Sequence, residues 1–324
     1  MSPKIFAIIV NWNGEKDTLV CLESLLKSTY DNLHIVISDN GSRKESLEVI
    51  NNWLAIHPVQ NGIGGGIKSV VVIENGKNLG FTGANTVGIL HSMKNDADYF
   101  LFLNNDAIAT PNFLIRMVEA GERDPKVGII GCKIFYADED PGGRHKIWSL
   151  GGYSFIKGIP INIATGEYDK PEWKGTQAQP LINGCCMLIK REVVETIGVQ
   201  DDALFFGIDD VEYSFRASRH GWRNIVVYDS SIYHAASQSV VPRSGLQVYY
   251  LFRNVLMFRS KYFPWYRNLL FYMFFTIRYV IFACMYRYFT GRSRVNIGVY
   301  WAIVDFINNK SGECSHSSLK PIAD

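Results

Sequence analysis

Short apolar runs alternate with amphipathic stretches through the first hundred residues, and this alternation constrains the fold more than any other feature of the chain. Apolar runs of strand length occupy residues 5–10, 33–38, 70–73 and 99–103. Helical spacing of apolar residues marks the intervals 15–28, 44–56 and 81–93. Continuously apolar strands separated by amphipathic helices are typical of a parallel sheet covered on both faces. The sequence therefore predicts an α/β fold with a mostly parallel sheet.

Polar residues follow each of the four predicted strands. They are Asn11-Trp12-Asn13-Gly14, Asp39-Asn40-Gly41-Ser42, Asn78-Leu79-Gly80-Phe81 and Asn104-Asn105-Asp106. Each group alone is explained by a turn, because Asn, Asp and Gly favour turns. Ligands of an open parallel sheet, however, bind beyond the carboxyl ends of its strands. Together, the four groups predict a nucleotide pocket at this edge.

Seven segments occur in an order and spacing that resemble a known family over about 250 residues. They are VNWNG (10–14), SDNGS (38–42), NLGFTGANTVGI (78–89), FLNNDA (102–107), NGCCMLIKREVVETIG (183–198), FFGIDDVEYSFRASRHGW (205–222) and YYLFRN (249–254). The sequence resembles the inverting glycosyltransferases of family 2, which have the GT-A fold. Within that family it is most similar to the bacterial rhamnosyltransferase-like branch. That fold is a Rossmann-like, mostly parallel sheet with helices on both faces.

The resemblance implies a donor site at the strand ends. Asp39 would accept a hydrogen bond from the ring N–H of a pyrimidine base, although an Asp in this position also closes turns. The other implied donor and nucleotide contacts are Asn11, Asn13, Asn78, Gly80, Phe81, Asn85, Asn104 and Asn105. Gly80 would let the backbone come close to the donor.

A divalent cation, Mg²⁺ or Mn²⁺, is implied at Asp106, because both ions accept carboxylate and phosphate oxygens. Asn104 stands where the family's Asp-x-Asp motif has its first Asp. His234 is the expected second metal ligand, and the alternative for this histidine is a purely structural role.

The resemblance implies that the catalytic base lies in the acidic pair Asp209-Asp210. Asp209 and Glu212 have the spacing of a capping box, so we predict that Asp210 takes the proton of the acceptor hydroxyl. Asp209 is the alternate base. Arg216 and Arg219, further along the same helix, would pair with these acids or with the diphosphate, or be solvated.

The acceptor side is expected at Gly184 and Cys185, where a glycine permits close approach of a sugar. Residues 136–180 carry many Gly, Pro, Trp and Lys residues without a clear period. They are expected to form loops or a hairpin that determine specificity. The six cysteines match no zinc motif or disulfide scaffold, which favours reduced thiols in a cytoplasmic protein.

The C-terminal region, residues 236–324, is predicted to be separate from a catalytic domain at 1–235. Residues 230–304 contain no Asp or Glu and nine cations: Arg243, Arg253, Arg259, Lys261, Arg267, Arg278, Arg287, Arg292 and Arg294. A basic, aromatic-rich helical segment favours peripheral association with the inner face of the cell membrane. The alternatives are a buried helix pair, an interface of a homo-oligomer, or a single span interrupted by Arg278.

These features predict an inverting, metal-dependent glycosyltransferase of cell-surface polysaccharide synthesis. Its donor would be a dTDP- or UDP-linked sugar, with rhamnose among the candidates, and its acceptor a saccharide hydroxyl, expected to be lipid-linked. No nucleic acid partner is expected. The alternatives are a nucleotidyltransferase, disfavoured because no Gly-rich basic loop follows the first strand, and a non-catalytic binding protein of the membrane surface.

Overall fold

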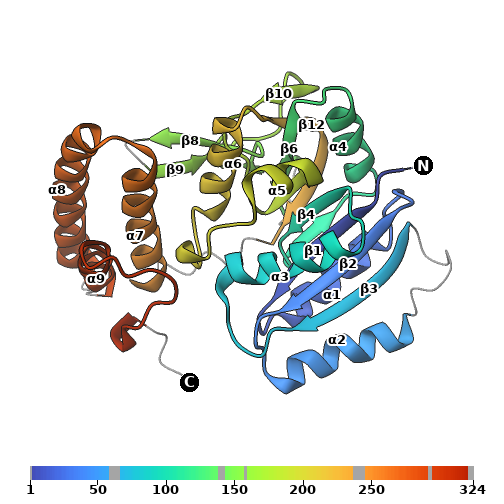
Figure 1. Cartoon of the computed structure of the whole chain (residues 1–324), viewed down its shortest axis with the longest axis horizontal. Coiled ribbons are helices and arrows are strands. Elements are labelled where there is room, and N and C mark those ends of the chain that lie inside the picture. Colours follow the sequence, from blue (N-terminus) through green and yellow to red (C-terminus); the bar gives the residue numbers. More distant parts are fainter. Residues whose placement is uncertain are drawn as a thin grey trace.

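A computed structural model describes residues 2–57, 66–137, 143–156, 159–235, 245–290 and 294–319. Three layers make up its larger part, with one sheet between two layers of helices (Figure 1). The predicted domain boundary at 235–236 falls at the limit of the described residues.

The main sheet has the strand order β10-β12-β6-β11-β4-β1-β2-β3. The strands are β1 (Ile5–Asn11), β2 (Leu33–Asp39), β3 (Ile67–Glu74), β4 (Tyr99–Leu103), β6 (Val127–Tyr136), β10 (Thr176–Ala178), β11 (Cys186–Lys190) and β12 (Arg223–His234). The four strands β3, β2, β1 and β4 are parallel, as expected, and β6 is parallel to β12. Strand β11 separates the two groups and is antiparallel to both of its neighbours.

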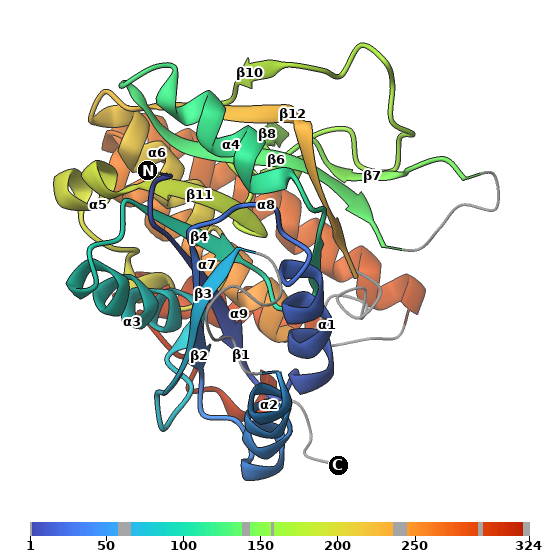
Figure 2. The ribbon, with the colours of Figure 1, turned by 90° about the vertical axis from the view of Figure 1, so that its right-hand side faces the viewer.

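Helices cover both faces of this sheet, which confirms the layered α/β prediction. They are α1 (Glu15–Leu25), α2 (Lys44–Ile56), α3 (Gly80–Lys94), α4 (Phe113–Glu122), α5 (Arg191–Ile197) and α6 (Asp209–Arg219). On β1, Ile5 and Ile9 join a core with α1, α2 and α4, whereas Phe6 and Ile8 join a core with α3, α5 and α6. Successive residues of a strand point to opposite faces, so a continuously apolar strand serves both cores. Helix α1 lies on the opposite side of the sheet from α3 and α5 (Figure 2).

Smaller strands extend the half of the sheet that contains β6 and β12. Strand β5 (Ala107–Ala109) pairs with β12, and β7 (Ile147–Ser149) pairs with β6. Strands β8 (Tyr153–Ile156) and β9 (Ile159–Asn162) form a separate antiparallel pair. The expected hairpin within residues 136–180 is therefore present.

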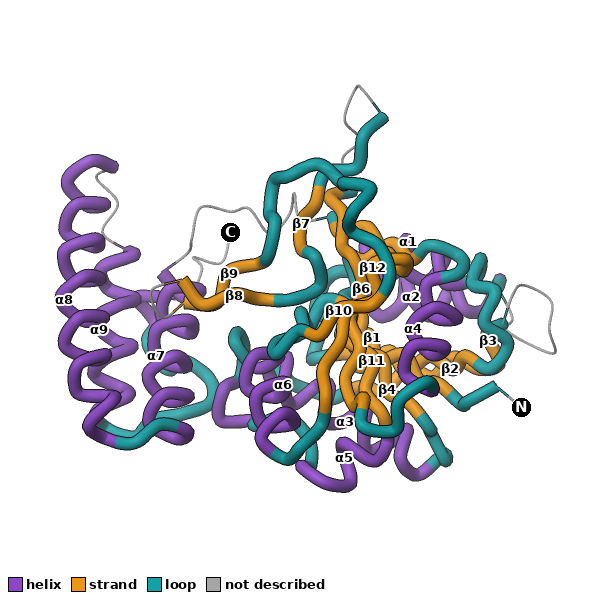
Figure 3. Tube along the Cα trace, turned by 90° about the horizontal axis from the view of Figure 1, so that it is seen from above, coloured by secondary structure: helices purple, strands orange, loops and turns teal. Residues whose placement is uncertain are grey.

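Three C-terminal helices stand at one end of the molecule: α7 (Gly245–Tyr262), α8 (Trp265–Thr290) and α9 (Arg294–Ile307). Seen from above, α7 lies nearest the sheet and α8 lies outermost (Figure 3). Their shared core also contains Leu181, Ile208 and Val211 from the sheet-bearing part. None of the helices in the described part of the chain is both long enough and apolar enough to cross a membrane.

Helix α7 is tied to residues 203–207, the segment that precedes α6. The side chain of Asn254 donates to the carbonyls of Leu204, Phe206 and Gly207 at 2.8, 2.9 and 3.0 Å. The fully buried Arg253 donates to the carbonyl of Leu204 at 3.2 Å. The sequence suggested that this cation binds lipid headgroups, but Arg253 instead donates to a carbonyl inside the protein. Buried carbonyls require such donors.

We expect Asn254→Ala to lower the free energy of unfolding by about 2–4 kcal/mol, since buried carbonyls lose their donor. Denaturant unfolding of the full chain measures this. Asn308→Ala is the matched control, because this exposed residue donates to the Val304 carbonyl at 2.8 Å. An Asn254 variant no less stable than the Asn308 variant would contradict the supporting role of α7.

Candidate active site

Asp39 and Asn11, at the ends of β2 and β1, form the first corner of the site. Asn11 Nδ2 donates to Asp39 Oδ2 at 2.8 Å, and the Ser42 amide donates to Asp39 Oδ1 at 2.9 Å. Asp39 thus closes the turn after β2, which was the alternative to a contact with the nucleobase. Only 1% of its surface is exposed. A carboxylate has about four acceptor positions, so recognition of a nucleobase stays compatible with this turn and stays a prediction.

Asn13 and Asn78 belong to the turns that frame this corner. Asn13, with a φ of +52°, accepts from the Arg43 amide at 2.8 Å. Asn78 Oδ1 accepts from the side chain of Asn40 at 2.9 Å and from the Gly80 amide at 2.8 Å. Asn40 was not among the predicted site residues, although it lies inside the SDNGS motif.

Gly80 packs so closely against the segment that precedes α6 that no side chain fits at this position. Its φ is +75°, and a Cβ atom at this position would lie 2.4 Å from the carbonyl oxygen of Phe205. The Phe81 amide donates to the same oxygen at 2.7 Å. The structure thus gives Gly80 and Phe81 a supporting role, whereas their contact with the donor stays a prediction.

Asp106 and His234 form the second corner. Strands β5 and β12 pair His234 with Ala107 in register, which places His234 Nε2 3.0 Å from Asp106 Oδ1. The Asn104 side chain lies 3.4 Å from the same nitrogen. His234 is almost fully buried, and its Nδ1 has no hydrogen-bond partner among the described residues.

This pair fits a divalent cation in chemistry and in spacing. Carboxylate and imidazole are both ligands of Mn²⁺-like ions, and two ligands at about 2.1 Å and a right angle lie about 3.0 Å apart. The described residues contain no group of three or more His, Cys, Asp or Glu side chains suited to a metal. Two protein ligands leave several positions to a diphosphate and water.

A chain of hydrogen bonds joins the first two corners. Asn105 Nδ2 donates to Thr18 Oγ1 at 3.2 Å, and Thr18 Oγ1 donates to Asn11 Oδ1 at 2.9 Å. Asn11 in turn donates to Asp39, and Asn105 precedes Asp106 in the chain. Thr18 was not predicted, because its place on an apolar helix face gives no separate signal.

Asp210 forms the third corner and is held by three donors. Tyr153 Oη donates to Asp210 Oδ2 at 2.6 Å, and the Gly184 amide donates to the same oxygen at 2.7 Å. The Val211 amide donates to Oδ1 at 2.8 Å. Burial raises the pKa of Asp210, and these hydrogen bonds oppose that rise.

Gly184 and Tyr153 therefore position the carboxylate. A Cβ atom on Gly184 would lie 3.0 Å from the Cβ of Asp210 and 3.2 Å from its Oδ2. Asn183 Nδ2 donates to Tyr153 Oη at 2.9 Å, which leaves the hydroxyl hydrogen for Asp210. Tyr153 was missed because it lies in β8, where the sequence predicted only loops or a hairpin.

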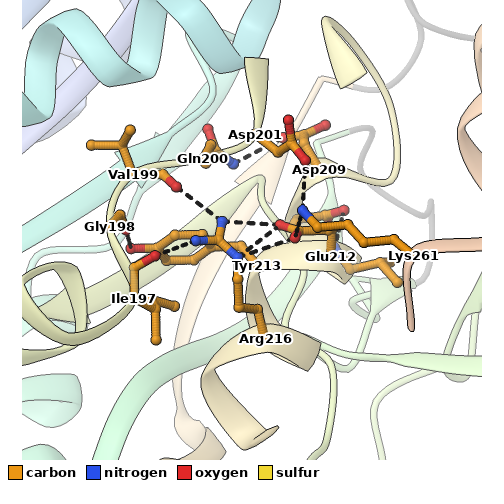
Figure 4. Close-up of polar contacts among 12 residues, drawn as sticks. Ile197, Gly198, Val199, Gln200, Asp201, Asp209, Glu212, Tyr213, Arg216 and Lys261 are labelled. Carbon is orange, nitrogen blue, oxygen red and sulfur yellow. Dashed lines mark hydrogen bonds and ion pairs between the residues drawn. The ribbon is translucent and has the colours of Figure 1, made fainter. Parts of the chain in front are cut away.

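Asp209 is the first residue of α6, and the predicted capping box is wrong. The N-cap is Ile208, with a φ of +55°, and no side chain caps the helix. Instead, Gln200 Nε2 donates to Asp209 Oδ2 at 3.1 Å (Figure 4). Asn85 Nδ2 donates to Gln200 Oε1 at 3.1 Å. Burial, with the charge of Asp210, raises the pKa of Asp209 to about 7.

The arginines of α6 serve the scaffold. Arg216 Nη2 lies 3.0 Å from Glu212 Oε2 and donates to the Val199 carbonyl at 2.9 Å (Figure 4). Lys261 of α7 reaches the same Glu212 at 3.1 Å. Arg219 donates to a carbonyl of α7. The expectation that these arginines pair with Asp209 or Asp210 is wrong, since Glu212 and backbone carbonyls are their partners.

Cys185 lies between the second and third corners. Its carbonyl accepts from the Asn104 amide at 3.0 Å, and its own amide donates to Asn183 Oδ1 at 2.9 Å. Burial raises the pKa of its thiol well above the usual value, and the charges of Asp106 and Asp210 both add to this. Both carboxylates therefore lie within electrostatic range of one thiol, which stays protonated at neutral pH.

A family model described as glycosyltransferase like family 2 matches residues 3–250, about three quarters of the chain. The chain belongs to this family. RfbC of Myxococcus xanthus, an O-antigen biosynthesis protein, is 24% identical over 245 residues, which are 74% of this chain and 18% of RfbC. The chain thus spans less than a fifth of that relative.

Two further relatives of the family are rhamnosyltransferases by name. The dTDP-rhamnosyl transferase RfbF of Shigella flexneri is 23% identical over 269 residues, 81% of each chain. The N-acetylglucosaminyl-diphospho-decaprenol L-rhamnosyltransferase of Mycobacterium tuberculosis is 25% identical over 237 residues, 67% of this chain and 71% of the relative.

Solved structures confirm the GT-A fold. GalNAc-T7 with UDP, GalNAc and Mn²⁺ has a TM-score of 0.60 at 16% identity, over 83% of this chain and 50% of that one. The mannosyltransferase PcManGT of Pyrobaculum calidifontis, with GDP-Man and Mn²⁺, has a TM-score of 0.55 at 15% identity, over 96% and 89%. Both neighbours were crystallised with a divalent metal.

We expect Asp209→Asn to gain stability relative to the wild type as the pH rises from 4 to 8. The raised pKa means that the folded state holds a proton that the unfolded chain releases near pH 4, so ionisation disfavours folding across this window. The difference reaches at most about 4 kcal/mol. Denaturant unfolding at several pH values measures it.

Asp96→Asn is the matched control, because Asp96 is exposed and its φ of +54° suits Asn. Its stability difference from the wild type should stay constant between pH 4 and 8. If the difference in unfolding free energy between Asp209→Asn and the wild type were also constant between pH 4 and 8, the buried environment described for the Asp209 carboxyl group would be contradicted.

Proposed function

We propose that this chain transfers a sugar from a nucleoside-diphosphate donor to an acceptor hydroxyl with inversion at the anomeric carbon. The observation that carries the proposal is the buried Asp210 carboxylate, held by Tyr153 and Gly184. Cys185, next to Gly184, is hydrogen-bonded through its carbonyl to the amide of Asn104, two residues before the Asp106 that pairs with His234. Direct displacement needs one general base and a stabilised leaving group. It needs no protein nucleophile, and the thiols of Cys185 and Cys186 have pKa values raised well above the ordinary value.

Asp210 is the base in this proposal. Its amide and hydroxyl donors fix the carboxylate in one orientation, and its raised pKa brings it closer to the value suited to proton transfer at neutral pH. Asp209, with a pKa of about 7, is partly protonated there, which reduces repulsion between the adjacent carboxylates. Asp209 stays the alternate base.

The donor would bind at the first two corners. Asp39, supported by Asn11, would recognise the base, and Asp106 and His234 would hold Mg²⁺ or Mn²⁺ against the diphosphate. A divalent cation in that place neutralises charge that develops on the leaving group. The names of RfbF and the mycobacterial relative support a rhamnosyl donor, dTDP- or UDP-linked, and a diphosphate-lipid acceptor in polysaccharide synthesis.

The proposal is tested with a panel of dTDP- and UDP-sugars, including dTDP-rhamnose, with Mg²⁺ or Mn²⁺ and lipid-diphosphate acceptors. We expect one donor to release nucleoside diphosphate, and Asp210→Asn to lower kcat by about 10²–10⁴-fold. Asp202→Asn, an acid of the same loop, should retain activity. Release of sugar 1-phosphate in place of nucleoside diphosphate would instead indicate nucleotidyl transfer, and no product with any donor would favour a binding protein.

We further propose that α8 docks on the inner face of the cell membrane. Ten large apolar or aromatic residues on its outer surface are 47–84% exposed: Trp265, Tyr266, Leu269, Leu270, Met273, Phe274, Ile277, Ile281, Met285 and Tyr288. Many repeat at four-residue spacing, and Arg267 and Arg278 are exposed on the same helix. An apolar stripe with arginines and no acidic residue suits anionic lipid headgroups.

Phe274→Glu with Ile277→Glu should abolish flotation of the full chain with phosphatidylglycerol liposomes, because each exposed side chain contributes about 1.5–3 kcal/mol on burial. The matched control places the same charges at Ile56 and Leu90, which are exposed outside α8. Unchanged flotation of the α8 variant would contradict membrane docking. Loss of a dimer in ultracentrifugation, without loss of flotation, would assign the stripe to a homo-oligomer.

A further inference from the structure

A cavity of about 460 Å³ lies where α6, α7 and α8 meet. Its walls are mostly apolar and aromatic, and its principal lining residues are Leu181, Phe215, Phe258, Arg259, Phe263 and Phe271. Arg259 is the single charged residue in the wall among the residues that the structure describes. None of these residues belongs to the three corners of the active site.

Arg259 is incompletely satisfied in this wall. Its guanidinium lies 4.2 Å from the ring centre of Phe263 and 4.4 Å from that of Phe271. Its Nη2 has one distant acceptor, the carbonyl of Arg267 at 3.5 Å. Its Nε is buried without a hydrogen-bond partner among the described residues. An arginine stays charged in proteins, and a buried donor without an acceptor is costly, so this wall suits an anionic ligand.

Two short segments of the chain connect the cavity wall to the residues around the proposed base. Phe215 lies five residues after Asp210 on α6, which corresponds to about 7.5 Å along a helix axis. Leu181 precedes Gly184 by three residues, and its carbonyl accepts from the Tyr153 amide at 3.3 Å. The residues that hold Asp210 therefore continue directly into the wall of the cavity.

We propose that this cavity binds the lipid end of the acceptor, with Arg259 on the diphosphate and the aromatic wall around the first part of the apolar chain. The inference rests on the proposed function, because it supplies the acceptor of the same site. An acceptor sugar would then reach Asp210 while its chain leaves the cavity beside α8.

The charge and composition of the cavity favour this occupant over a neutral one. A ligand with an anionic diphosphate next to a long apolar chain matches a cation set among aromatic rings. Arg267 is close enough that its charge, after burial, contributes to the lowered pKa of Arg259. Positive charge from two arginines, with no acidic residue among the described residues of the cavity wall, favours the binding of anions over uncharged metabolites.

Farnesyl diphosphate is the probe, because it carries both chemical features in a soluble molecule. Calorimetric binding to the full chain is measured without nucleotide sugar, for the wild type, Arg259→Gln, Arg259→Lys and Arg116→Gln. Arg116 is the matched control, since it is an exposed arginine of α4, outside the cavity. We expect Arg259→Gln to weaken binding roughly 10- to 100-fold, Arg259→Lys to weaken it less, and Arg116→Gln to leave it unchanged.

Two fragments of the probe separate the contributions of the head and the chain. Inorganic diphosphate should bind the wild type more weakly than farnesyl diphosphate does, because it lacks the chain that fills the cavity, and Arg259→Gln should weaken that binding further. Farnesol should bind weakly and independently of Arg259. Equal affinity of Arg259→Gln and the wild type for farnesyl diphosphate would overturn the proposal, as would farnesol binding as tightly as its diphosphate. Equal competition by short-chain phosphatidylglycerol would assign the cavity to a bilayer lipid and overturn it too.

Failure of this inference is distinguishable from failure of the proposed function. Arg259→Gln should raise the KM for a lipid-diphosphate acceptor by a larger factor than it changes the KM for the donor. If the chain hydrolyses the donor but Arg259→Gln binds the acceptor as tightly as the wild type does, the inference is overturned and the glycosyltransferase proposal stands. Arg259-dependent binding of farnesyl diphosphate without any transfer or hydrolysis would contradict the proposed function and keep the lipid site.

Discussion

The segment from Ala203 to Asp210 is held by donors on several sides, and the proposed active site depends on this constraint. Asn254 and Arg253 of α7 donate to its carbonyls, and the Phe81 amide of α3 donates to Phe205. Carbonyls in a buried loop must find donors, so the position of this segment is determined by α7 and α3 together. Asp209 and Asp210 are the residues that emerge from it.

This constraint gives the C-terminal helices a role in the chemistry. Helix α7 supports the loop before the base, while Lys261 joins Glu212 on the same helix as Asp210. The outer helix α8 presents the exposed apolar stripe. Membrane docking on α8 and acceptor binding would therefore occur on elements that α7 connects to α6. The domain division at 235–236 stays a prediction, but α7 shares a core with Ile208 and Val211 on the other side of it.

The sequence predicted features that depend on local pattern. The helix at 44–56 and the strand at 99–103 have the bounds expected, because apolar period alone marks them. The turn residues at the strand ends do lie at one edge. The position of strand β11 was harder to predict, since its antiparallel pairing with β4 and β6 depends on residues far away in the chain.

The site was predictable only where a motif carried it. Asp210 lies in a family motif, whereas Tyr153 is 57 residues upstream in a segment without a clear period. The capping box failed because Asp209 faces Gln200 inside the protein, which no spacing on α6 reveals. The basic composition of its segment suggested that Arg253 lies on the surface, but the residue is fully buried. The carbonyl of Leu204 that it donates to belongs to a distant part of the chain, which the local sequence does not reveal.

A crystal structure of the full chain with the cognate nucleotide sugar and Mn²⁺ tests the central claim most directly. The claim is that Asp39, Asp106 and Asp210 face a single bound donor. The expected electron density has the nucleobase at Asp39, the diphosphate beside Asp106 and His234, and the anomeric carbon on the side of Asp210. A donor bound elsewhere, or one whose sugar points away from Asp210, would contradict it.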